Sequence, residues 1–120
     1  MSIDTNGSYY IQNSWTNKFL SHHATEMSAR AEDAWAFEQV PGDDADLFYI
    51  RSLVNREYLT HEASQMSSTA GAGEEWRVTS RGGNWLLQNK LNGEYKCAEA
   101  TRLERVCDVE TEFALNKCKA

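Results

Sequence analysis

The polar side chains that could bind a ligand are concentrated in three segments of similar sequence. Amide, carboxylate, imidazole and guanidinium groups can exchange hydrogen bonds with sugar hydroxyls, and an aromatic side chain can cover the apolar face of a sugar ring. His22 and His61 occupy the same position in two segments, and Ala98 occupies it in the third. The polar candidates and one tryptophan are Trp15, Thr16, Asn17, His22, His23 and Glu26, then Asn55, Arg56, His61, Glu62 and Gln65, then Asn92, Glu94, Glu99 and Arg102.

Nine of these residues make up the predicted ligand-binding set. An alternative interpretation is that the two matched histidines are surface residues that persist from the duplication of a repeat. The nine residues are Asn17, His22, His23, Asn55, Arg56, His61, Glu62, Asn92 and Glu99.

Other site chemistries have weaker support in the sequence. His22 and His23, taken with His61 or Glu62, do not have the spacing of a metal site. The sequence has no nucleophile elbow, glycine-rich phosphate loop or paired-carboxylate motif. We therefore expect no metal, no cofactor and no catalytic residues, and we predict a binding protein that is not an enzyme.

The ligand-binding candidates recur because the chain contains an internal repeat. Ile11, Ile50 and Leu87 are separated by 39 and then 37 residues, and an aromatic residue follows each of them by eight positions. Each repeat closes on an aromatic-x-apolar group, which is Trp35-Ala36-Phe37 in the first copy. A single domain over residues 1–120 is predicted, with repeats at roughly 8–46, 47–83 and 84–120.

Each repeat is predicted to contain four short strands, because apolar and polar residues alternate. In the first repeat the expected strands are 9–12, 18–22, 27–31 and 34–39. Asn92-Gly93 is the strongest signal for a two-residue hairpin turn. A helical alternative exists for 24–37 and 99–112, which are rich in Ala, Glu and Arg.

Three repeats of four strands predict an all-β protein with pseudo-threefold symmetry, the β-trefoil. In that architecture six strands form a short barrel and six form hairpins that cover one end. The residues expected to fill the core are Trp35, Trp76 and Phe113, with Phe37, Val78, Leu115, Ile11, Ile50, Leu87, Met27, Met66 and Leu103 in layers around them.

Two strings and one closing motif resemble fascin-type trefoil repeats. They are Lys18-Phe19-Leu20-Ser21, the segment 56–62, and Trp35-Ala36-Phe37-Glu38-Gln39 followed by an acidic loop. The resemblance runs through nearly the whole chain and implies filamentous actin as a partner. A single trefoil lacks the second site that filament bundling requires.

The predicted fold is also that of ricin-B-type lectins, but their motif is altered here. Their repeats close on Gln-x-Trp, whereas Asp33, Glu74 and Thr111 stand two residues before the closing aromatics. A ricin-type sugar site therefore cannot be transferred residue by residue. Glycan binding through other polar groups of the loops stays open.

Composition limits the partners and the compartment. The formal charge of −6 disfavours nucleic acid and anionic lipid surfaces. The N-terminal residues lack the pattern of a signal peptide, and no segment is long and apolar enough for membrane insertion, so we expect a cytoplasmic protein. Cys97, Cys107 and Cys118 are expected to be free thiols, although the Cys97–Cys107 separation would allow a bridge across a hairpin.

The sequence therefore predicts a non-enzymatic binding module, lectin-like, with glycans or glycoproteins as partners. The first alternative is a fascin-like actin-binding protein. The second is a trefoil protease inhibitor that presents the loop 41–46 or the loop 69–73.

Overall fold

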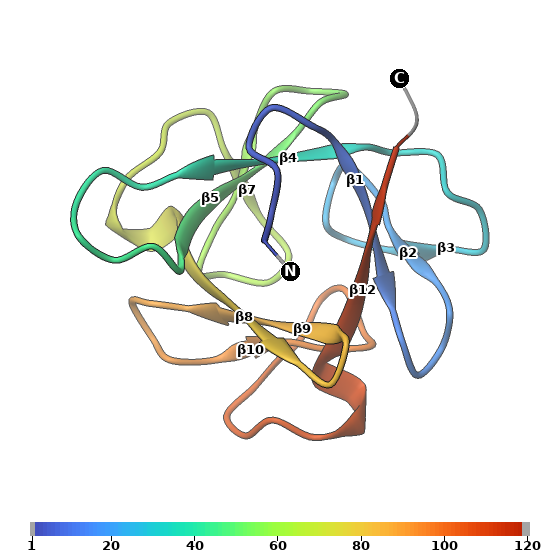
Figure 1. Ribbon diagram of the computed structural model, residues 1–120. Coiled ribbons are helices and arrows are strands. Elements are labelled where there is room, and N and C mark those ends of the chain that lie inside the picture. Colours follow the sequence, from blue (N-terminus) through green and yellow to red (C-terminus); the bar gives the residue numbers. More distant parts are fainter. Residues whose placement is uncertain (1, 119–120) are drawn as a thin grey trace.

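The computed structural model describes residues 2–118, which form one closed antiparallel sheet of twelve strands. Six of these strands build a barrel in which each strand pairs with the next around the ring and β12 pairs with β1 (Figure 1). Closure leaves the barrel strands without a free edge. The barrel strands are β1 (Tyr9–Asn13), β4 (Trp35–Gln39), β5 (Leu47–Ser52), β8 (Glu75–Arg81), β9 (Asn84–Asn89) and β12 (Glu112–Lys117).

The other six strands are each two residues long. They pair as three hairpins outside the barrel, one hairpin in each repeat. They are β2 (Phe19–Leu20) with β3 (Met27–Ser28), β6 (Tyr58–Leu59) with β7 (Met66–Ser67), and β10 (Tyr95–Lys96) with β11 (Leu103–Glu104). Within residues 2–118 the helical content is limited to two 3-10 turns, η1 (Ala72–Glu74) and η2 (Val109–Thr111). The helical alternative for 24–37 and 99–112 is therefore wrong.

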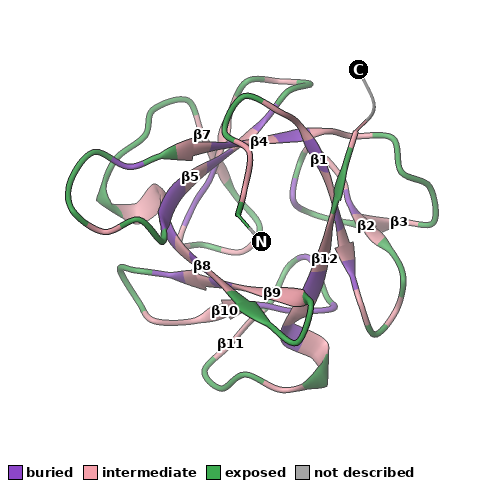
Figure 2. Ribbon diagram, in the orientation of Figure 1, coloured by how far each residue is buried: buried purple, intermediate pink, exposed green. Residues whose placement is uncertain are grey.

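The core lies inside the barrel, and buried residues alternate with less buried ones along strands such as β1 and β4 (Figure 2). Trp35, Trp76 and Phe113 are fully buried, as the repeat predicts. Ile11, Ile50 and Leu87 are fully buried too, so the three anchors of the repeat are core positions. Phe37 and Val78 are buried as well. The other expected layer residues are partly buried and pack against this core; they are Met27, Met66, Leu103 and Leu115.

Two indole groups connect the barrel to the hairpins. Nε1 of Trp35 donates to the carbonyl oxygen of Leu20 at 3.3 Å, and Nε1 of Trp76 donates to that of Leu59 at 3.0 Å. The third repeat has Phe113 in place of tryptophan, and the residue that matches the two leucines is Lys96.

Lys96 is buried with 1% of its surface exposed. Its Nζ donates to the carbonyl oxygen of Ala100 at 2.9 Å. Desolvation lowers the pKa of this amine to about 8, because a buried ammonium loses its hydration. The third repeat therefore places a titratable group where the other repeats place a leucine.

The tight hairpin turn lies at a different position from the one predicted. Residues 90–94 connect β9 to β10, and Gly93 has a φ of 73° there, so the two-residue turn predicted at Asn92-Gly93 is wrong in length. The two-residue turn is Gly82-Gly83 between β8 and β9, with φ of 55° and 87°. Positive φ at both positions is what a type I′ turn needs, and glycine adopts it without steric conflict.

The three cysteines are free thiols, with Cys97 buried and Cys107 exposed, so the bridge between them is not formed. No helix in the described part of the chain has the length and apolarity that a membrane span requires.

Candidate functional site

In the second and third repeats, the loop that follows the first strand contacts a hairpin loop of the preceding repeat. Asn55 at the start of the second repeat donates from Nδ2 to the carbonyl oxygen of His22 at 3.1 Å. Asn92 in the third repeat donates in the same way to the carbonyl oxygen of His61 at 2.9 Å. These two bonds join repeat 2 to repeat 1 and repeat 3 to repeat 2.

At the remaining interface, between repeat 1 and repeat 3, the same positions hold Thr16 and Ala98. Among residues 2–118 no hydrogen bond joins these two residues, because a threonine side chain is shorter than asparagine and has no amide group. Thr16 instead accepts a bond from the backbone N–H of Lys18 through its Oγ1 at 3.3 Å. The two loops therefore face each other without the side-chain bridge that the other interfaces have.

This unbridged interface contains a hollow of about 500 Å³, which we call the Trp15 cleft. Trp15 stands at its edge with 59% of its surface exposed, an unusual position for the largest apolar side chain. The lining residues are Trp15, Thr16, Lys18, Met27, Ala98, Glu99, Ala100, Thr101, Arg102 and Glu110.

Trp15 is held by a fully buried asparagine. Oδ1 of Asn13 accepts bonds from the backbone N–H groups of Trp15 and Thr16, each at 3.1 Å. Nδ2 of Asn13 donates to the carbonyl oxygen of Glu110 in the third repeat at 2.8 Å. A single buried side chain thus fixes the Trp15 loop and attaches it to Glu110 of the third repeat. The indole is presented on a preorganised loop, which reduces the entropy lost on binding.

Residues 97–102 form the wall of the cleft opposite the Trp15 loop, and buried side chains fix this segment. Lys96 donates to Ala100, as described above, and Sγ of Cys97 contacts the carbonyl oxygen of Arg102 at 3.2 Å. The backbone N–H of Arg102 donates to the carbonyl oxygen of Glu99 at 3.2 Å. Burial raises the pKa of the Cys97 thiol, so this sulfur is a neutral part of the wall.

Arg102 is surrounded by carboxylates. Its Nε donates to Glu99 at 2.5 Å, its Nη1 donates to Glu104, and its Nη2 donates to Glu110 at 3.2 Å. The hydrogen bonds that Arg102 donates to Glu99 and Glu104 raise the pKa of Arg102 further above its usual range. Arg102 therefore fixes the positions of three acidic side chains at the cleft and carries a permanent positive charge among them.

Three carboxylates next to the cleft, those of Glu104, Asp108 and Glu110, lie within 4.8 Å of one another. Arg102 bonds two of them and supplies the counter-charge. The cluster of three carboxylates is therefore part of an ion-pair network with Arg102.

The nine residues predicted for ligand binding are divided among the three interfaces. His22 and Asn55 meet at one interface and His61 and Asn92 meet at another, where their backbone and amide groups bridge the loops. Of the nine residues, Glu99 lines the Trp15 cleft. Asn17 and Arg56 adopt left-handed turn conformations with φ of 62° and 67°, at the position that Gly93 occupies in the third repeat.

His22 and His61 occupy the same position in two repeats but make different contacts. Nδ1 of His22 lies 2.9 Å from a carboxylate oxygen of Asp33, whose pKa is raised by burial but lowered more by its hydrogen bonds with His22. The His61 ring packs so closely on Gly73 that an added Cβ would lie 2.5 Å from Nδ1. The His23 ring lies beside that of His22, with ring centroids 3.9 Å apart and ring planes at 46°. Glu62 lies beside His61, at 3.9 Å between Oε1 and Nε2.

The sequence marks Trp15, Thr16 and Arg102 as polar or aromatic loop residues but does not place them in one site with Glu99. Lys18 and Glu110 are not among the residues predicted for the site. The signal that could have found the site is the break in the pattern at Thr16, where the other repeats have Asn55 and Asn92.

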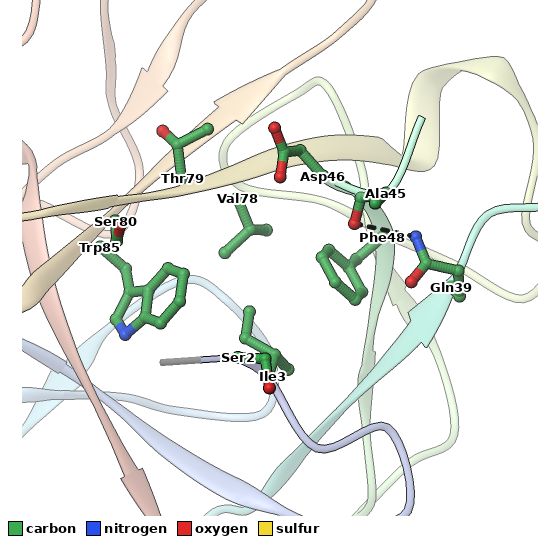
Figure 3. A pocket seen from close by; sticks show the side chains of 10 residues that line it. All are labelled: Ser2, Ile3, Gln39, Ala45, Asp46, Phe48, Val78, Thr79, Ser80 and Trp85. Atoms are coloured by element: carbon green, nitrogen blue, oxygen red, sulfur yellow. Dashed lines mark hydrogen bonds between the residues drawn. The ribbon is translucent and has the colours of Figure 1, made fainter. Parts of the chain in front are cut away.

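A second hollow, of about 460 Å³, lies at the open end of the barrel. Figure 3 shows Ile3 pointing into it, toward Phe48, Val78 and Trp85. The N-terminal segment thus covers this opening with one of its own apolar side chains, and Ile3 packs against the core. Among the described residues that line this hollow only Asp46 is charged, whereas the Trp15 cleft has Lys18, Glu99, Arg102 and Glu110 on its walls.

No protein-family model matches the chain, and no curated protein matches it by sequence. Solved structures do match. The designed threefold-symmetric protein ThreeFoil superposes with a TM-score of 0.75 at 17% identity, covering 92% of this chain and 98% of that one. The chain folds as a β-trefoil. The architecture predicted from the repeat is confirmed.

Two sugar-binding proteins share this β-trefoil fold with the chain. SeviL, solved with the asialo-GM1 saccharide, has a TM-score of 0.76 at 17% identity over 94% of this chain and 98% of its own. A lectin from Polyporus squamosus has a TM-score of 0.72 at 17% identity, covering 97% of this chain and 50% of that one. At these identities the similarity establishes the fold, and the resemblance to fascin stays a prediction.

Proposed function

We propose that this β-trefoil is a non-enzymatic module that binds glycans in the Trp15 cleft. The observation that carries the proposal is an exposed indole at the edge of a polar hollow, on a loop fixed by the buried Asn13. The apolar face of a sugar ring can pack on such an indole while the ring hydroxyls bond to groups on the walls.

The walls of the cleft offer both acceptors and donors for hydroxyl groups. Glu99 and Glu110 provide carboxylate oxygens, Thr101 provides a hydroxyl, and Lys18 provides an ammonium. The fold supports the same proposal, because SeviL was solved with a saccharide and the Polyporus squamosus lectin with the epitope Neu5Aca2-6Galb1-4GlcNAc. Actin binding and protease inhibition stay predictions that no feature of the structure favours over glycan binding.

A glycan array probed with the purified protein at high concentration tests the proposal. We expect discrete hits that Trp15→Ala abolishes. The absence of any hit, with the protein shown to be folded by its circular dichroism spectrum, would overturn the proposal.

A further inference from the structure

We infer that the Trp15 cleft selects uncharged glycans and rejects glycans that carry a carboxylate or sulfate group. This inference rests on the proposed function and names its ligand class. It follows from the charges on the walls and from the hydrogen bonds that Arg102, which lines the cleft, already makes to carboxylates of the protein.

The first observation is the state of Arg102. Arginine commonly recognises an anionic group through two parallel hydrogen bonds from its guanidinium. Here Nε, Nη1 and Nη2 of Arg102 each donate to a carboxylate of the protein, those of Glu99, Glu104 and Glu110. Each nitrogen of the guanidinium is therefore already bonded to a carboxylate of the protein, and an incoming anion would compete with these glutamates.

The second observation is the balance of charge around the cleft. Among the described residues, Glu99 and Glu110 line the cleft together with Lys18 and Arg102, and the carboxylates of Glu104 and Asp108 lie beside that of Glu110, so the cleft and its surroundings have an excess of negative charge. The whole chain carries a formal charge of −6, so the wider field has the same sign. An anionic ligand therefore meets net repulsion, and like charges brought together in a binding site are strongly disfavoured.

The third observation is what the carboxylates can still do. The side chain of Glu99 is 65% exposed, although one of its oxygens accepts from Arg102. An ionised carboxylate only accepts hydrogen bonds, so its free lone pairs suit the hydroxyl or amide N–H donors of an uncharged sugar. Charge-assisted bonds of this kind are stronger than those between neutral groups.

The chain provides a matched pair of positions for the test. Glu62 in the second repeat is equivalent to Glu99 in the third, and its side chain is 56% exposed. Glu99→Gln and Glu62→Gln change the total charge by the same amount. Both residues belong to the set predicted from the sequence, but Glu99 lines the Trp15 cleft, whereas Glu62 lies beside His61, outside the residues that line it. Any effect of net charge alone will be the same in both variants.

The experiment is a glycan array printed with matched sets, each neutral glycan beside its sialylated and its sulfated form. It is probed with the wild-type protein and both variants at low and at physiological salt. We expect every bound neutral glycan to bind at least about tenfold more tightly than its acidic forms. Glu99→Gln should lower the ratio of the affinity for a neutral glycan to that for its acidic forms, and Glu62→Gln should leave this ratio unchanged. Added salt should lower the ratio in the wild type.

Two results would overturn the inference, and they differ. Equal or tighter binding of the acidic forms refutes the charge selection while glycan binding stands. If Lys18→Ala then removes the acidic hits, the lysine is the anion-binding group. No binding to either form refutes glycan binding itself, and the inference with it.

Discussion

Nδ2 of Asn55 donates a hydrogen bond to the carbonyl oxygen of His22, 3.1 Å away and 33 residues earlier in the chain. The bond from Asn92 to His61 repeats this relationship one repeat later. Both asparagines also accept a bond within their own loop, from the backbone N–H of Glu57 and Glu94. Thr16 makes the local bond to Lys18 without the cross-repeat bond, and that difference leaves the Trp15 cleft unbridged.

Asn55→Thr isolates the cross-repeat bond. Threonine can keep the local acceptor role that Thr16 shows, but it has no amide to reach His22. We expect the free energy of unfolding to fall by about 0.5–1.5 kcal/mol, the usual net contribution of one hydrogen bond, as measured by urea denaturation. A value unchanged from the wild type would show that this bond does not hold the two repeats together.

Thr16→Asn is the reverse substitution. The new amide should donate to the carbonyl oxygen of Ala98, because the equivalent asparagines at the other two interfaces reach His22 and His61. We expect the free energy of unfolding to rise by up to about 1 kcal/mol. Glycan binding should weaken at least about tenfold, because the two loops are then bridged. Thr16→Ser, which cannot bridge, is the control. Full binding by Thr16→Asn would show that the ligand does not enter between these loops.

Lys96 makes stability depend on pH in a specific direction. Its pKa in the folded protein, about 8, lies below the ordinary value of 10.5. Below pH 8 the amine is charged in both the folded and the unfolded protein, so the full cost of burying this charge opposes folding. Between pH 8 and 10.5 the folded protein is neutral at this site while the unfolded chain still binds the proton. Stability from this group therefore rises with pH across that window, by up to about 3 kcal/mol.

Lys96→Leu tests this effect, since leucine is the residue at the same position in the other two repeats. We expect the variant to be about 1–3 kcal/mol more stable than the wild type at pH 7, less the bond lost to Ala100. The difference should shrink between pH 8 and 10.5 in urea titrations. The exposed Lys90→Leu should show no such change. A constant difference across that window would mean that Lys96 is not desolvated in the folded protein.

The barrel could be predicted from the sequence because its information is local and repeated. Alternation fixes which side of each strand is buried, and Ile11, Ile50 and Leu87 mark the same core position three times. Strand ends were predicted less well. The strand expected at 18–22 is Phe19–Leu20, because the hairpins outside the barrel pair over two residues only.

The site was harder to predict because it is assembled from residues far apart in the chain. Trp15 and Arg102 share a cleft only because β12 closes the ring against β1. The burial of Lys96 could not be read from its type, since lysine is rarely buried. The one sequence signal for this burial is that the third repeat has Lys96 in place of leucine and also Phe113 in place of the tryptophan of the other repeats.

Trp15 and Leu91 allow the central proposal to be tested with an internal control. The two residues are equivalent in the repeat and almost equally exposed, at 59% and 57%, but Leu91 belongs to an interface that Asn92 bridges. Isothermal titration of the strongest array glycan into the wild type, Trp15→Ala and Leu91→Ala is the most direct measurement. We predict that Trp15→Ala weakens binding at least about tenfold and that Leu91→Ala leaves it unchanged. Undiminished affinity in Trp15→Ala would contradict the account.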